Sequence, residues 1–197
     1  MTAKYRPTVA IIYGFAEGPL VGKYFRRLLH QKGFRVITDP QEADIIVTHS
    51  GGVYYLPQDL QGKTVLIVAP TYWRFGDSLI KGGLSKIRQE AQHAIKKHHL
   101  RRWFEKAYIN TMYVFGDVPA SVRMFQTAKI AGKDLPLCNA KRVGVISHHN
   151  DAWSGYIQKV AVEKYLPYCL ISHAGSHDDI WIHPKDYVAV IQYLYES

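Results

Sequence analysis

The feature that most constrains the fold is a regular alternation of short apolar runs with longer stretches of helical periodicity. Strands of a parallel sheet are buried on both faces and read as nearly continuous apolar runs, and helices carry the chain from one strand to the next. The pattern therefore predicts an α/β fold with a mostly parallel central sheet of about six strands flanked by helices. The predicted strands are residues 8–14, 34–38, 43–49, 63–70, 142–151 and 168–179.

Three of the connecting or closing segments have helical signals. Residues 19–33 place Leu20, Tyr24 and Leu28 on one face of a helix, and Gly33 is a stop signal. A short helix is expected after the glycines that follow residue 49. The final predicted helix spans residues 184–197 and has a proline near its first turn.

Length and composition indicate one globular domain over residues 1–197, with a possible helical cap within 73–141. The chain is 47% hydrophobic and 21% charged, which does not favour disorder. No apolar run reaches the roughly 18 residues of a membrane span, and no cleavable leader is evident, so we expect a soluble, cytoplasmic protein. Cys138 and Cys169 could pair, but two thiols do not indicate a disulfide framework.

The net charge of +9 is concentrated in residues 86–106. A basic segment of this kind is most simply a solvated surface helix, and the alternative is a basic cap that attracts an anionic ligand. A further alternative is association with nucleic acid through this segment and its aromatics Trp103 and Phe104. No recognition module is present, so no specific nucleic-acid partner is expected.

The third apolar run ends in Thr48-His49-Ser50-Gly51-Gly52. A serine nucleophile on a strand-to-helix turn needs small residues two positions to either side, because strand and helix nearly touch there. Gly52 meets this requirement and Thr48 is larger than the usual glycine. The N–H of Gly51 would be one donor to an oxyanion. The alternative is an ordinary serine that caps a helix.

A second oxyanion donor would be the N–H of Phe15, which follows the first strand. With "IIYGFAEGP" followed by "ADIIVTHSGG", the chain resembles the opening of an α/β-hydrolase, in which a His-Gly-aromatic loop precedes a His-Ser-x-Gly elbow. Tyr13 stands in place of the loop histidine, and Thr48 in place of the first elbow glycine. Among these enzymes, the chain is most similar to the small single-domain serine hydrolases of the retinoblastoma-binding-protein type.

The order of the remaining polar loops agrees with this resemblance. In α/β-hydrolases the acid and then the histidine follow the nucleophile along the chain. Asp151 follows the fifth predicted strand and His177 the sixth, so they would be the acid and the base. Asp151 could instead be a simple turn aspartate. A metal site is also open, with candidate ligands His148, His149, Asp151, His173, His177, Asp178, Asp179 and His183.

The resemblance implies hydrolysis of a carboxylic ester or thioester through an acyl-enzyme, by a Ser50-His177-Asp151 triad that requires no metal or organic cofactor. The expected partner is thus a small-molecule acyl substrate. Aromatic residues after the strands would line its pocket, although packing at the edge of the core explains each equally well; they are Tyr54, Tyr72, Trp73 and Trp153. A non-catalytic binding protein with this fold is the main alternative. Oligomeric state does not follow from the sequence.

Overall fold

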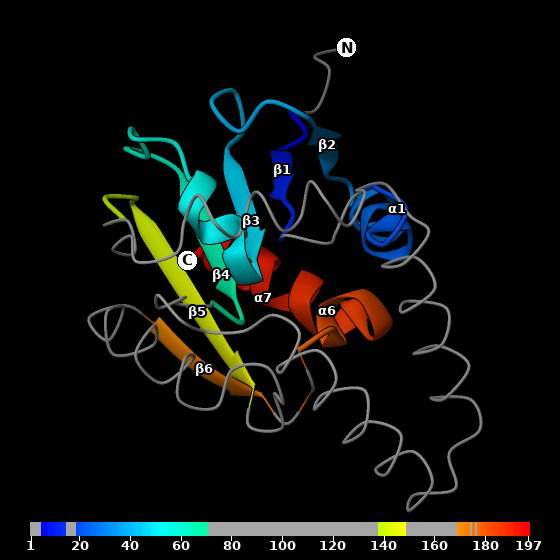
Figure 1. Ribbon diagram of the computed structural model, residues 1–197. Coiled ribbons are helices and arrows are strands. Elements are labelled where there is room, and N and C mark those ends of the chain that lie inside the picture. Colours follow the sequence, from blue (N-terminus) through cyan, green and yellow to red (C-terminus); the bar gives the residue numbers. More distant parts are fainter. Residues whose placement is uncertain (1–4, 15–18, 71–137, 149–168, 174, 176) are drawn as a thin grey trace, which may run out of the picture.

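The computed structural model describes residues 5–14, 19–70, 138–148, 169–173, 175 and 177–197. Within these residues a six-stranded sheet has the order β2-β1-β3-β4-β5-β6, and each neighbouring pair is parallel (Figure 1). The predicted α/β fold is therefore confirmed. The strands are β1 Thr8–Ile12, β2 Arg35–Ile37, β3 Ile45–His49, β4 Thr64–Val68, β5 Arg142–His148 and β6 Cys169–His173. The basic segment 86–106 and the possible cap lie outside the described residues.

Alternate side chains of the strands build two apolar layers, one on each face of the sheet. Val47 and Val68 belong to the first layer, and Ile46 and Ile67 belong to the second. All four are fully buried. Burial on both faces explains why these strands read as continuous apolar runs in the sequence.

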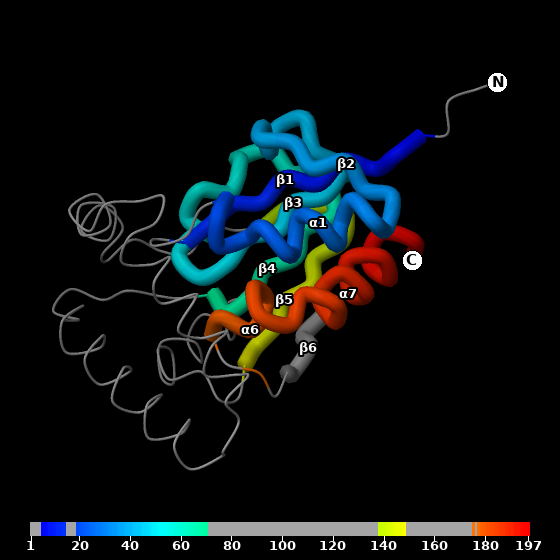
Figure 2. The backbone as a smooth tube through the Cα atoms, turned by 90° about the vertical axis from the view of Figure 1, so that its right-hand side faces the viewer, coloured from blue at the N-terminus to red at the C-terminus, as the bar shows by residue number. Residues whose placement is uncertain are grey.

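Helices cover the first layer. They are α1 Lys23–Gln31, α6 Asp179–Ile182 and α7 Pro184–Glu196. Figure 2 shows them together over one face of the sheet, and α1 contacts both of the others. The second layer is covered in part by the short 3-10 helix η1 Ser50–Tyr55, through Val53. No helix in the described ranges is long and apolar enough to cross a bilayer.

The orientation of α1 differs from the sequence prediction. The side chains of Leu20 and Tyr24 are 47% and 54% exposed. The residues that face the sheet are each one position later along the chain: Val21, Phe25 and Leu29. Val21 lies just before α1, and Leu28 of the predicted set is half-buried and packs at the border of the same layer, so packing against the sheet and α6 turns the buried face by one position.

The predicted stop at Gly33 is confirmed. Gly33 has φ +89°, which a residue with a side chain rarely adopts. Its N–H donates to the carbonyl of His30, and the N–H of Phe34 donates to that of Leu29. This is a Schellman motif, and Phe34 and Leu29 both belong to the first apolar layer.

At the amino-terminal ends of the strands, Asp44 directly precedes β3 and is hydrogen-bonded to the first residues of β1 and β4. Its carboxylate accepts hydrogen bonds from the backbone N–H and the hydroxyl of Thr8 and from the hydroxyl of Tyr5, each at 2.6 Å. Partial burial acts to raise the pKa of Asp44, but these hydrogen bonds and the charge of Lys63 outweigh it, so the pKa lies below the usual value. The hydrogen bond that the Tyr5 hydroxyl donates to Asp44 raises the pKa of Tyr5 to about 12. The contacts of Asp44 at this edge stabilise the fold.

The opposite edge has the geometry of a ligand site. In the strand order the direction of succession reverses between β1 and β3, since β2 lies to one side of β1 and β4 lies beyond β3. Open parallel sheets bind ligands at the carboxyl ends of the strands that flank such a switch point. The two segments that leave the sheet here begin with Tyr13 and with Ser50.

Candidate active site

Ser50 has an uncommon backbone conformation. It follows β3 directly, with His49 still extended at φ −123° and ψ 142°, and its own φ is +51°. A left-handed conformation costs a residue with a side chain about 1–2 kcal/mol. Ser50 is the first residue of η1, and His49 occupies the N-cap position. An N-cap residue typically has β-region backbone angles, so the left-handed φ of Ser50 does not fit the plain helix-capping role considered from the sequence.

Gly52 allows this turn to form. A Cβ atom on Gly52 would lie 2.5 Å from the carbonyl oxygen of Ile12, 2.8 Å from Oγ1 of Thr48 and 2.9 Å from the carbonyl oxygen of Tyr13. No side chain fits in that space. Thr48 is larger than the small residue that such a turn usually has two positions before the serine. Its side chain is nevertheless accommodated and fully buried, because Gly52, which faces it, has no Cβ. The sequence pattern predicts this close approach correctly.

Tyr13, in the position of the family's loop histidine, is a packed aromatic residue. Its ring stacks on Trp181 of α6 at a centroid distance of 5.6 Å. A Cβ on Gly22 would lie 2.6 Å from the Tyr13 hydroxyl oxygen, so the ring also covers the start of α1. Tyr13 thus fixes the end of β1 against two helices.

His177 lies next to the serine turn. Its carbonyl oxygen is 2.8 Å from Nε2 of His49, the residue before Ser50, and the two imidazole rings are 4.7 Å apart. A carbonyl oxygen only accepts hydrogen bonds, so Nε2 of His49 carries the proton. His49 is fully buried, while Ser50 and His177 are each 7% exposed. The fold brings together residues that are 128 positions apart.

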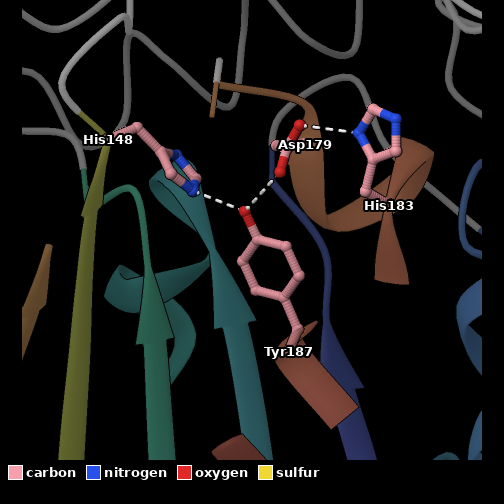
Figure 3. A network of polar contacts seen from close by, with 4 residues as sticks. All are labelled: His148, Asp179, His183 and Tyr187. Carbon is pink, nitrogen blue, oxygen red and sulfur yellow. Dashed lines mark hydrogen bonds and ion pairs between the residues drawn. The ribbon is translucent and has the colours of Figure 1, made fainter. Parts of the chain in front are cut away.

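A network of four polar side chains joins the end of β5 to α6 and α7 (Figure 3). The Tyr187 hydroxyl is 2.7 Å from Nε2 of His148 and 3.2 Å from Oδ2 of Asp179, and Oδ1 of Asp179 is 2.9 Å from Nδ1 of His183. Burial, and next the nearby Asp179, raise the pKa of Tyr187 far above its ordinary value. Sequence reasoning missed Tyr187, because it sits at a core position of α7 among apolar residues and gives no polar signal of its own.

The other predicted site residues divide into two groups. Gly51 is buried in η1, and Tyr54 is half-buried and packs against the second apolar layer. In the part of the chain that the structure describes, no three His, Cys, Asp or Glu side chains are grouped to hold a metal ion. The predicted residues that lie outside the described ranges are Phe15, Tyr72, Trp73, His149, Asp151 and Trp153, and the side chain of His173 also lies outside them.

Comparison with known proteins identifies the fold. No family model and no curated protein matches the sequence. Three similar solved structures are an esterase from Exiguobacterium antarcticum (TM-score 0.67, 11% identity, 97% of this chain and 92% of that one), an enol-lactonase from Burkholderia xenovorans (0.64, 14%, 100% and 94%) and a carboxylesterase of Nitrososphaera gargenis (0.58, 16%, 95% and 89%). The protein therefore has the fold of the α/β-hydrolases.

Proposed function

We propose that this protein is a serine hydrolase that cleaves a carboxylic ester or thioester, with Ser50 as its nucleophile. The observation that carries the proposal is the left-handed backbone of Ser50 on the tight turn between β3 and η1. Such a turn places a serine hydroxyl at the carboxyl end of a parallel sheet, and its unfavourable conformation persists only where the surrounding structure enforces it. The similar structures include an esterase, a carboxylesterase and an enol-lactonase, which supports the same class of reaction here.

His177 is the proposed general base. It is held beside the serine turn by the hydrogen bond from His49, and it is largely shielded from water. Asp151 is the proposed acid that orients the imidazole, on the basis of its place in the chain after β5. A serine hydroxyl needs both partners, because it is a weak nucleophile until a base takes its proton.

Two backbone N–H groups, of Gly51 and Phe15, are the proposed oxyanion donors. The first N–H groups of a helix have no partner within the helix, and Gly51 is the second residue of η1. Ile12 pairs with Thr48 in the sheet register, so residues 13 and 14, which precede Phe15 in the sequence, leave the sheet beside the serine turn. Removal of one such donor typically costs about 2.7–4 kcal/mol of transition-state stabilisation.

The reaction then proceeds in two halves. Ser50 Oγ attacks the acyl carbon as His177 takes its proton, and the tetrahedral intermediate collapses when His177 returns that proton to the departing alkoxide or thiolate. Water attacks the resulting acyl-enzyme by the same route and restores Ser50. No cofactor takes part. The aromatic residues Tyr54, Tyr72, Trp73 and Trp153 are proposed to contact the acyl group.

Within the α/β-hydrolase fold, we place the protein with the small hydrolases of the retinoblastoma-binding-protein type, acting in the cytoplasm. The packed ring of Tyr13 at the loop-histidine position favours a second candidate, a binding protein that retains the fold without turnover. The two candidates differ in whether Ser50 is chemically activated.

Labelling with a fluorophosphonate, followed by peptide mapping, tests the proposal. We expect the wild-type protein to be modified at Ser50 and the Ser50→Ala variant to remain unlabelled. Ser147→Ala is the matched control, because Ser147 lies near the carboxyl end of β5 at the same sheet edge, and it should label normally. Labelling at another residue would refute the assignment of Ser50, and an unreactive wild type would favour the binding protein.

A further inference from the structure

Tyr187 of α7 connects the end of β5 with the start of α6, which follows β6 in the chain. Its hydroxyl is 2.7 Å from His148, the last residue of β5, and 3.2 Å from Asp179, the first residue of α6 (Figure 3). Its side chain is fully buried, and its ring also contacts the His148 ring edge-on at a centroid distance of 5.9 Å. Tyr187 is 39 positions from His148 in the sequence and only eight positions from Asp179.

The directions of these hydrogen bonds follow from the chemistry of the groups. A carboxylate only accepts, so the Tyr187 hydroxyl donates its single proton to Asp179. The hydroxyl oxygen can then accept from His148, which requires the proton of His148 to be on Nε2. Nδ1–H of His183 donates to the other oxygen of Asp179. The same carboxylate is thereby held from two sides.

Both ends of this link lie close in the sequence to proposed catalytic residues. His148 precedes Asp151 by three positions, and Asp179 follows His177 by two. Gly175 also lies against Asp179, because a Cβ on Gly175 would be 2.5 Å from the carboxyl carbon of Asp179. The Asp179 carboxylate therefore supports the turn that carries His177.

We infer that Tyr187 is a positioning residue, which holds the end of β5 and the His177 turn in a fixed relation and thereby sets the position of the proposed base. Its catalytic consequence rests on the proposed function. The link itself does not, because it consists of contacts among described residues. Burial keeps Tyr187 neutral, so that its hydroxyl remains a donor.

The first test measures the link without using catalysis. Backbone hydrogen exchange is compared between the wild type and Tyr187→Phe, which removes only the hydroxyl. We expect exchange to become about tenfold faster at both residues 144–148 and residues 177–183, as loss of a buried hydrogen bond allows. The control is Tyr193→Phe in the same helix, because Tyr193 is 68% exposed and its replacement should change neither segment.

The second test measures the consequence with p-nitrophenyl acetate as substrate. A small displacement of a catalytic group can reduce turnover by about 10²-fold, so we expect Tyr187→Phe to lower kcat by at least about tenfold while KM stays close to the wild-type value. A pair of variants at His148 separates the hydrogen bond from packing. His148→Gln retains a donor near Nε2 and should keep most of the turnover, whereas His148→Met has similar length, lacks the donor and should lose it.

The outcomes distinguish failure of the inference from failure of the proposed function. If Ser50 labels and turns over normally but Tyr187→Phe changes neither exchange nor kcat, the inference is overturned and the hydrolase stands. If the wild type neither labels nor turns over, the hydrolase fails, and the exchange data alone decide whether Tyr187 links the two segments. If Tyr187→Phe does not fold, equal exchange and turnover in the Gln and Met variants of His148 overturn the inference.

Discussion

The hydrogen bond from His49 to the His177 carbonyl allows a sharp test of how the serine turn and the histidine turn are held together. We compare His49→Gln with His49→Met. The two replacements have similar length, and both lose the ring contacts of His49 with His177 and Trp181. Only glutamine places an N–H near the position of Nε2. The difference between the two variants therefore isolates the donor.

The magnitude follows from burial. His49 is fully buried, and so the loss of its donor leaves a carbonyl oxygen without its hydrogen bond in a place that water does not readily reach. An unsatisfied buried acceptor costs about 1–3 kcal/mol. In a domain of this size each kcal/mol lowers Tm by about 2–4 °C, so His49→Met should unfold roughly 2–12 °C below His49→Gln.

The assay is thermal unfolding followed by circular dichroism, with the rate of fluorophosphonate labelling as a second measurement. We expect the methionine variant to unfold earlier and to label more slowly than the glutamine variant. If His49→Met is as stable as His49→Gln, or more stable, the hydrogen bond does not contribute to the stability of this region and the reasoning from geometry is wrong.

Two further predictions concern the turn and the opposite edge of the sheet. Gly52→Ala should lower the unfolding free energy by about 1–3 kcal/mol and abolish labelling, because its Cβ meets backbone oxygens that cannot move aside. Gly144→Ala is the control, because its Cβ meets the flexible end of a leucine side chain. This variant should unfold and label much more like the wild type. Asp44→Asn should lower Tm near neutral pH, because the lowered pKa of Asp44 stabilises the fold fully above the ordinary value of 3.8. The difference from wild type should shrink below pH 3.8 and be lost as the pH falls through the lowered pKa of the folded state. Thermal unfolding from pH 7 to pH 2 checks this, with the exposed Asp59→Asn as control, and a difference that persists in acid would contradict it.

The fold was largely predictable because its signals are local. The central strands β3 and β4 are buried on both faces, so each appears in the sequence as an apolar run bounded by polar or turn residues. Gly33 marked the end of α1 for a similarly local reason, its positive φ. The predicted buried face of α1 was wrong by one position, because Tyr24 and Phe25 begin two neighbouring apolar stripes on the helix and only contacts with distant segments choose between them.

The candidate site was predictable only where a single turn defines it. Gly52 signals the close approach of strand and helix, and Ser50 occupies the strained position that results. The bonds from His49 to His177 and from His148 to Tyr187 join residues far apart in the chain, and neither has a local signature. A tyrosine in an amphipathic helix looks like an ordinary core residue until its partners are known.

The position of Tyr187 in the chain has a consequence for biosynthesis. The six described strands all precede α7, so α7 is the last of the described elements to be synthesised. Until α7 docks, the nascent protein would have the turn of the proposed nucleophile but not the support for the proposed base. Competence for the proposed reaction would then arise as a late event in synthesis.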